Sequence, residues 1–472
     1  MRQFMKNCGV FFLGLAIRLL LPVTASGNVF LPAIFGDHMV LQQQSEITIW
    51  GWARALEPIT IIASWDRQPI QTKADNHANW QVKLKTPKAG GPYNLIVIGN
   101  NTIVLQDIMI GEVWLCSGQS NMEWSANAGI DDGSKEIQQA NYPNIRFFQV
   151  GHRTATSRQL DVFGQWELCT PQTMANFSAI AYFFGRELHQ QLDVPIGLIN
   201  SSWGGTPAET WMNPELINKD AQFAQAASRF KPVAWCPMEP GAAYHAMIAP
   251  LIPIVIAGVI WYQGETNTLN PIEYRRLFPA LIDSWRKEWQ RDFPFYYVQI
   301  APYNYGPQPK GVLLREAQLL SLSVPNTGMV VVSDIGNIND IHPRNKRDVG
   351  RRLANWALAK SYGYKDIAYS GPIYRSMVVE GDKIRIFFDH AEKGLVCKGE
   401  KLTHFQIAGK DSVFVEAEAK IDGSTVVVRS PKVKKPVAVR FGWSNTAEPN
   451  LFNADGLPAS CFRTDDWPIQ LE

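Results

Sequence analysis

The stretch Val113-Trp114-Leu115-Cys116-Ser117-Gly118-Gln119-Ser120-Asn121-Met122-Glu123-Trp124 passes from apolar to small and polar residues within a few positions. The apolar run begins at Ile108 and does not alternate, which predicts a central strand of a parallel sheet covered on both faces. Gly118 permits a tight turn after this strand. Ser120 is therefore expected at the carboxyl end of a central strand, where open α/β sheets bind their ligands.

A serine after a strand is common in turns, so a catalytic role requires partner residues. A nucleophilic hydroxyl needs a base, a group that orients the base, and donors for a developing oxyanion. Three further apolar runs end in polar loops, at residues 194–200, 254–262 and 329–333. Helical periods separate these runs, which predicts a parallel sheet with crossover helices, and the loops that follow its strands are expected to meet at one edge.

The loop after residue 333 supplies the best base, because the imidazole of His342 can take and return a proton near neutral pH. His245, which precedes a strand, is its rival. Asp340, two residues before His342, is the first candidate to orient the imidazole, and Asp334 is the second. The expected oxyanion donors are the backbone of Ser120, the glycine pair and one side-chain amide: Ser120, Gly204, Gly205 and Gln263.

The regions on either side of this α/β pattern have β character. Apolar and polar residues alternate around Ile47 and around Val82, which predicts an N-terminal β-sandwich-like domain over residues 27–107. We interpret it as a packing module in preference to an independent sugar-binding module. The α/β domain is expected over 108–365, and returning β patterns predict a C-terminal β-rich domain over 366–472.

Residues 1–26 resemble a secretory signal peptide, with basic residues before an apolar segment and a small-residue exit near Ala25. The apolar run is too short for a membrane helix, and no later segment is long enough to span a bilayer. The chain is therefore expected to be secreted or periplasmic. The remaining five cysteines are scattered, so they predict neither a disulfide framework nor a metal site, although one or two bridges stay open.

The composition is that of a globular protein, with 45 basic and 43 acidic residues and thus no excess of positive charge for binding nucleic acid. The chain contains 16 tryptophans. Many should lie in the core, but flat indoles also bind sugars, which favours a carbohydrate ligand. The aromatic residues considered for a sugar platform are Trp124, Trp203, Trp211, Tyr303 and Tyr305.

Four blocks, in chain order, resemble those of the SGNH/GDSL hydrolase superfamily, and most closely its sialate O-acetylesterase branch of carbohydrate esterases. They are Gly118-Gln119-Ser120-Asn121-Met122, Trp203-Gly204-Gly205-Thr206, Trp261-Tyr262-Gln263-Gly264-Glu265 and Asp340-Ile341-His342-Pro343. The segment 461–467 is also similar to that branch. The resemblance implies a flavodoxin-like three-layer α/β/α domain in which Ser120 is the nucleophile and His342 the base, without a metal or another cofactor.

The sequence departs from the wider superfamily in two places. The third block offers Gln263, with Asn267 four residues on, where an oxyanion asparagine is usual, and the position three residues before His342 is Asn339. The first departure leaves the donating amide open, and the second leaves the orienting aspartate open. Further residues of the blocks are candidates for binding substrate: Gln119, Asn121, Trp203, Glu265 and Asn267.

These features predict a carbohydrate O-acetylesterase that acts through an acetyl-enzyme on Ser120. The resemblance alone suggests O-acetylated sialic acid as substrate, with acetylated xylan or pectin as the alternative. A lipase- or thioesterase-like hydrolase is disfavoured because the loops lack a long apolar lid. A non-catalytic glycan-binding protein remains the alternative of another class.

Overall fold

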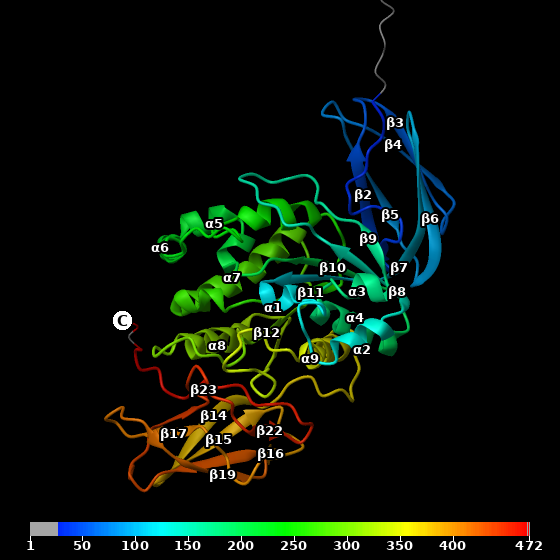
Figure 1. Cartoon of the computed structure of the whole chain (residues 1–472). Helices are drawn as coiled ribbons and strands as arrows, with labels where there is room; N and C mark the ends of the chain where they lie inside the picture. Colours follow the sequence, from blue (N-terminus) through cyan, green and yellow to red (C-terminus); the bar gives the residue numbers. More distant parts are fainter. Residues whose placement is uncertain (1–26, 470, 472) are drawn as a thin grey trace, which may run out of the picture.

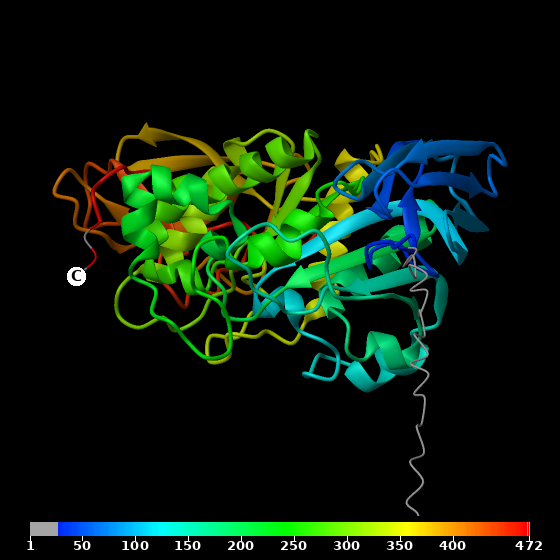
Figure 2. The ribbon, with the colours of Figure 1, turned by 90° about the horizontal axis from the view of Figure 1, so that it is seen from above.

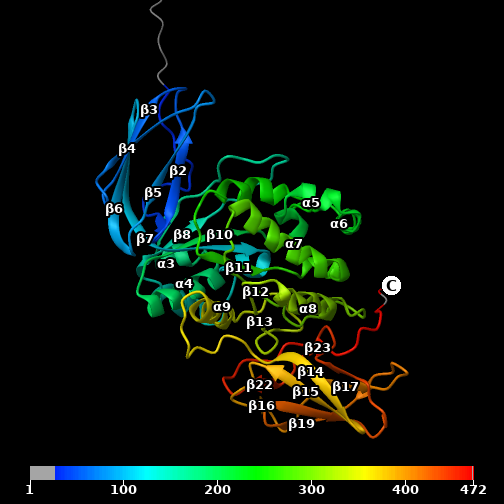
Figure 3. The same ribbon diagram turned by 180° about the vertical axis from the view of Figure 1, so that it is seen from behind.

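The computed structural model describes residues 27–469 and residue 471, so the expected signal peptide lies outside the described residues. An α/β domain occupies the middle of the molecule, with one β domain at each end (Figures 1 and 2). The same arrangement is seen from behind in Figure 3.

The central sheet has the strand order β13-β12-β11-β7-β10-β8-β9, and all its neighbouring strands are parallel except β8 and β9. Its first strand in sequence lies in the middle, between β10 and β11, as the unbroken apolar run predicts. The loops after these three strands therefore start side by side. The strands are β7 (Thr102–Gly118), β8 (Tyr142–Gln149), β9 (Trp166–Cys169), β10 (Ile196–Ser202), β11 (Gly258–Tyr262), β12 (Phe295–Val298) and β13 (Thr327–Val330).

Two helix pairs cover the two faces of this sheet, which confirms the three-layer α/β/α expectation. Helices α4 (Ala179–Leu192) and α9 (Lys346–Lys360) pack on the face that presents Trp114. Helices α7 (Pro271–Trp289) and α8 (Lys310–Leu320) pack on the face that presents Trp261 and Tyr297. Many tryptophans are thus core residues, and the fully buried ones include Trp114, Trp211, Trp261 and Trp285.

Ser178 caps α4 by accepting a hydrogen bond from the Ala181 amide, as expected for a serine at that position. The remaining α-helices are short. The short α-helices are α1 (Ser120–Glu123), α2 (Gly133–Gln139), α3 (Pro171–Met174), α5 (Pro214–Lys219) and α6 (Ala221–Ala227). Within residues 27–469, no helix combines the length and apolar character needed to cross a membrane.

The N-terminal β domain packs the β2–β5 ribbon against a sheet formed by β1, β3, β4, β6 and the first half of β7. Strand β7 then continues without a break into the centre of the α/β sheet, so residue 107 lies within a strand and not in a linker. The two domains also share one continuous apolar core. The strands are β1 (Val40–Gln42), β2 (Glu46–Trp52), β3 (Pro58–Ala63), β4 (Pro69–Lys73), β5 (Asn79–Lys85) and β6 (Gly90–Ile98).

The C-terminal β domain has a core of its own, built from alternating inward residues of two four-stranded sheets. Residues such as Ile386 and Val428 from one sheet face Ile407 and Phe441 from the other. None of the five described cysteines forms a disulfide. The strands are β14 (Ile373–Glu380), β15 (Lys383–Asp389), β16 (Leu395–Cys397), β17 (Phe405–Ala408), β18 (Val415–Glu416), β19 (Glu418–Asp422), β20 (Thr425–Arg429), β21 (Ala438–Phe441), β22 (Leu451–Asn453) and β23 (Phe462–Arg463).

Candidate active site

Ser120 lies at the first position of α1, directly after the turn that ends β7. The turn requires glycine, because Gly118 has a φ of +137° and a Cβ there would lie 2.1 Å from the carbonyl oxygen of Tyr262. The next residue, Gln119, donates its backbone N–H to that same oxygen at 2.9 Å and accepts hydrogen bonds from Gly264 and Thr266 through its side-chain oxygen. These contacts fix Ser120 relative to the loop after β11.

His342 reaches Ser120 from the loop after β13, at the edge of the sheet. Its Nε2 lies 3.0 Å from Ser120 Oγ, and its ring stacks on Trp124 with centroids 4.2 Å apart. Burial and the positive charge of Lys346 lower the pKa of His342, and the carboxylate of Asp340 opposes them. The imidazole is therefore neutral at neutral pH and has a lone pair available for the serine proton.

Neither candidate aspartate binds the imidazole. Asp340 Oδ1 accepts the backbone N–H of His342 at 2.9 Å, while His342 Nδ1 is 4.0 Å away, too far for a hydrogen bond. This is the turn that an Asp side chain makes with the amide two residues on, so the spacing that suggested a catalytic pair instead shapes the loop. Asp334 pairs with both terminal nitrogens of Arg352 at 2.7 Å. The expectation that Asp340 or Asp334 hydrogen-bonds to the imidazole is thus contradicted by the geometry.

Two of the four expected oxyanion donors are available. Within the described part of the chain, the backbone amides of Ser120 and Gly205 donate to no protein acceptor. The Gly204 amide instead donates to Glu123 Oε2 at 2.6 Å. Gln263 is fully buried, and its Nε2 donates to the Thr206 carbonyl and to Asn267. The prediction that Gln263 serves the oxyanion is therefore contradicted, because both amide hydrogens are used to hold loops together.

A cleft of about 530 Å³ opens at Ser120 and His342. Of the residues proposed to bind substrate, Gln119, Trp203 and Glu265 line it. Asn121 and Asn267 are fully buried and do not, so their expected contact with substrate is contradicted. The full lining is Gln119, Ser120, Glu123, Trp124, His152, Trp203, Gly204, Gly205, Trp235, Glu265, Thr266, Ile341 and His342.

Some of the aromatic residues considered for a sugar platform belong elsewhere. Trp211 is fully buried and donates its indole N–H to Thr206. Tyr303 and Tyr305 do not line the cleft, whereas Trp124 and Trp203 do. His245, the rival base, is also absent from the cleft and lines a neighbouring cavity.

Three residues that sequence reasoning missed complete one wall of the cleft. His152 Nε2 lies 2.8 Å from Glu123 Oε1, and the His152 ring stacks on Trp203 at 4.2 Å. Burial alone would lower the pKa of His152, but the hydrogen bond and charge of Glu123 raise it. Trp235 extends this wall with 68% of its surface exposed, and its carbonyl accepts the Trp203 indole N–H at 2.9 Å.

Below the cleft, Asn121 joins a buried acid to a buried base. Asn121 Nδ2 donates to Glu265 Oε1 at 2.6 Å, and its Oδ1 accepts from Lys346 Nζ at 2.6 Å. Burial raises the pKa of Glu265 and lowers that of Lys346 to about 7. Glu265 Oε2 is buried as well and has no partner in the described part of the chain.

A nucleophile beside a neutral base and two free amides is the site of a serine ester hydrolase. A family model described as "Carbohydrate esterase, sialic acid-specific acetylesterase" matches residues 110–359. The chain belongs to this family of carbohydrate esterases. It is a carbohydrate O-acetylesterase by family, and its fold is that of its relatives.

Relatives match over most of the chain. The sialate O-acetylesterase of Homo sapiens is 30% identical over 449 residues, which cover 84% of this chain and 80% of the relative. That of Rattus norvegicus is 32% identical over 403 residues, covering 71% and 74%. A crystal structure of a carbohydrate acetylesterase from Xanthomonas citri is 39% identical, with a TM-score of 0.86 over 93% of this chain and all of the other.

Proposed function

We propose that the chain removes O-acetyl groups from O-acetylated sialic acid by nucleophilic catalysis at Ser120, and that it acts as a secreted or periplasmic enzyme. The observation that carries the mechanism is the 3.0 Å contact between Ser120 Oγ and His342 Nε2 beside the free amides of Ser120 and Gly205. The sialate O-acetylesterases among the relatives support the substrate. The signal-like sequence of residues 1–26 supports the location.

In the first half-reaction, Ser120 Oγ attacks the acetyl carbonyl carbon while His342 Nε2 takes the hydroxyl proton. The amides of Ser120 and Gly205 donate to the oxyanion of the tetrahedral intermediate. The intermediate collapses, the C–O bond to the sugar breaks, and His342 returns the proton to the sugar oxygen. In the second, His342 takes a proton from water as the water oxygen attacks the acetyl carbonyl carbon. The bond from that carbon to Ser120 Oγ then breaks, His342 returns the proton to Ser120 Oγ, and acetate leaves.

The support for His342 comes from packing, since no carboxylate among the described residues hydrogen-bonds to its Nδ1. The Trp124 ring lies almost parallel to the imidazole, at an interplanar angle of 18°. The Asp340 carboxylate holds the backbone N–H of the same residue. We therefore propose a Ser120–His342 pair in which Trp124 and Asp340 are positioning residues.

The charge of the cleft favours a second substrate class, the neutral acetylated polysaccharides such as xylan. Glu123 and Glu265 line the cleft, but no Lys or Arg from the described residues does. The carboxylate of a sialic acid would find no fixed positive charge there, apart from a protonated His152. A neutral sugar carries no charge that the carboxylates lining the cleft could repel.

Acetate release tests these proposals together. Wild-type protein and Ser120→Ala are incubated with O-acetylated sialoglycoprotein and, separately, with acetylated xylan, and free acetate is measured. The proposal predicts release from the sialoglycoprotein by wild type alone. Release from xylan alone would select the neutral substrate class, and equal release by Ser120→Ala would exclude the mechanism.

A further inference from the structure

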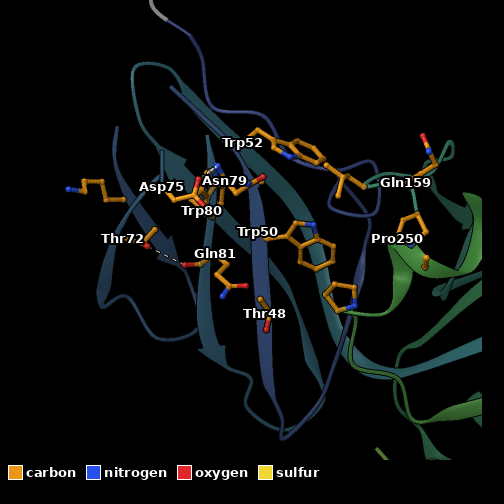
Figure 4. A pocket seen from close by; sticks show the side chains of 15 residues that line it. Thr48, Trp50, Trp52, Thr72, Asp75, Asn79, Trp80, Gln81, Gln159 and Pro250 are labelled. Atoms are coloured by element: carbon orange, nitrogen blue, oxygen red, sulfur yellow. Dashed lines mark hydrogen bonds between the residues drawn. The ribbon is translucent and has the colours of Figure 1, made fainter. Parts of the chain in front are cut away.

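A second groove, of about 560 Å³, lies between the N-terminal β domain and the α/β domain. It shares no residue with the catalytic cleft. Figure 4 shows Trp50 and Trp52 on the side of β2 that faces Gln159 and Pro250, with polar side chains across the strand. Its lining consists of Thr48, Trp50, Gly51, Trp52, Thr72, Lys73, Asp75, Asn79, Trp80, Gln81, Gln159, Leu160, Ala249, Pro250 and Pro253.

The core accounts for only one of the two tryptophans of β2, because Trp50 packs against it and Trp52 does not. Strand β2 turns Ile47 and Ile49 inward, whereas Trp50 and Trp52 lie on the opposite, half-buried face. The Trp50 ring packs edge-on against Phe35 with centroids 4.6 Å apart, and Trp52 is not among the residues packed on the core. Aromatic area left open to solvent on a β ribbon is typical of binding surfaces.

Polar side chains that are free to bind a ligand lie along the same groove. Within the described residues, the exposed side-chain amide of Gln81 makes no hydrogen bond, and that of Gln159 reaches only the Ser157 carbonyl, at 3.0 Å. Indole faces together with free amides suit a sugar, which has apolar C–H faces and hydroxyls at its edge.

The charges of the groove select among sugars. Lys73 and Asp75 are the charged residues of its lining, and their charges cancel. Two backbone amides donate to the Asp75 carboxylate and lower its pKa, so it stays ionised and offsets the charge of Lys73. A lining without net charge offers anionic chains such as polysialic acid or nucleic acid no attraction, so a neutral chain suits it better.

We propose that this groove binds a neutral stretch of glycan chain, at a site separate from the catalytic cleft. The segment that begins at His152 in the cleft reaches Gln159 and Leu160 in the groove, so both sites open along one loop. Holding a long chain at the groove raises the local concentration of its acetyl groups at Ser120 without a contact to the reacting atoms. The inference rests on carbohydrate as the ligand class and not on the catalytic role of any residue.

Native electrophoresis in gels that contain deacetylated arabinoxylan, galactomannan or polysialic acid tests the proposal with the full chain. At least one neutral polysaccharide should retard wild-type protein, and Trp52→Ala should weaken that binding at least about tenfold, as expected when a central tryptophan anchor is removed. Trp65→Ala is the matched control, because Trp65 lies in the same domain, packs against Tyr93 and is outside the groove.

Hydrolysis of 4-nitrophenyl acetate should be unchanged in both variants, which also shows that both are folded. The proposal would be overturned if neither arabinoxylan nor galactomannan retarded the wild-type protein, or if polysialic acid alone did so. Equal retardation of wild type and Trp52→Ala would also overturn it. Loss of esterase activity in Ser120→Ala is measured separately, so a failure of the proposed mechanism would not be confused with a failure of this site.

Discussion

Ser120 Oγ and His342 Nε2 lie 3.0 Å apart although 222 residues separate them in the chain. Ser120 follows the central strand β7, whereas His342 comes from a long loop after β13, at the edge of the sheet. The loop therefore reaches across three strand positions of the sheet, from β13 to β7. The Asp340 carboxylate shapes its backbone by accepting the His342 N–H. The catalytic proposal depends on this one contact, and the predictions below test it and its supports.

Asp340 is expected to matter far less than a triad aspartate would. In Asp340→Asn the side-chain oxygen can still accept the His342 backbone N–H, so kcat/KM on 4-nitrophenyl acetate should stay within about tenfold of wild type. Loss of a triad aspartate costs about 10⁴-fold in kcat. Steady-state kinetics of the purified variant decide between the two, and a loss near the larger value would restore Asp340 to the triad.

The pH profile reports the state of His342. Because its pKa is lowered, the neutral and active form persists below the usual pKa of about 6.5, and kcat/KM should rise with pH along a limb centred below that value. The Asp340 carboxylate acts to raise the pKa, so Asp340→Asn should move the limb to lower pH. A limb centred above about 6.5, or one that moves upward in the variant, would contradict this assignment.

Much of this site follows from the sequence, because apolar runs that end in polar loops identify the carboxyl ends of parallel strands. That pattern predicted Ser120 and His342 correctly as neighbours. It did not reveal which way an amide points, and Gln263 donates to Thr206 and Asn267 instead of lining the cleft. His152 follows the end of β8 at Gln149, but no motif in the sequence marks it as part of the site.

Other features had no sequence signal. Trp235 lies in an irregular segment without period, and only the folded chain shows that its carbonyl holds Trp203. The N-terminal boundary was expected at residue 107 because the alternating pattern changes there. The change marks the point where β7 passes from one sheet to another and becomes buried on both faces.

Trp235→Ala should weaken glycan substrates selectively. The indole is exposed at the rim of the cleft, and the backbone carbonyl that binds Trp203 remains in the variant. KM on an acetylated oligosaccharide should rise about tenfold, as for the loss of an aromatic anchor, while kinetics on 4-nitrophenyl acetate stay unchanged. Trp235→Tyr should recover part of the loss. Equal effects on both substrates would indicate a structural role instead.

Gly118→Ala should destabilise the fold strongly. The added Cβ would meet the Tyr262 backbone at 2.1 Å, and the positive φ adds strain. We expect a loss of at least about 3 kcal/mol in the free energy of unfolding, measured with denaturant. The control is Gly456→Ala, which has a φ of +81° but open space around it and should lose only about 1–2 kcal/mol. Similar losses in the two variants would contradict the close approach.

The central claim, that Ser120 and His342 form the catalytic pair, is tested most directly by the turnover of 4-nitrophenyl acetate in Ser120→Ala and His342→Ala, with folding checked by circular dichroism. In subtilisin, removal of the catalytic serine or histidine alone costs about 2 × 10⁶-fold in kcat, about as much as removal of the whole triad. We predict that each variant here loses at least about 10³-fold and that the double variant loses no more than the worse single one. A folded Ser120→Ala with activity near that of wild type would contradict the account.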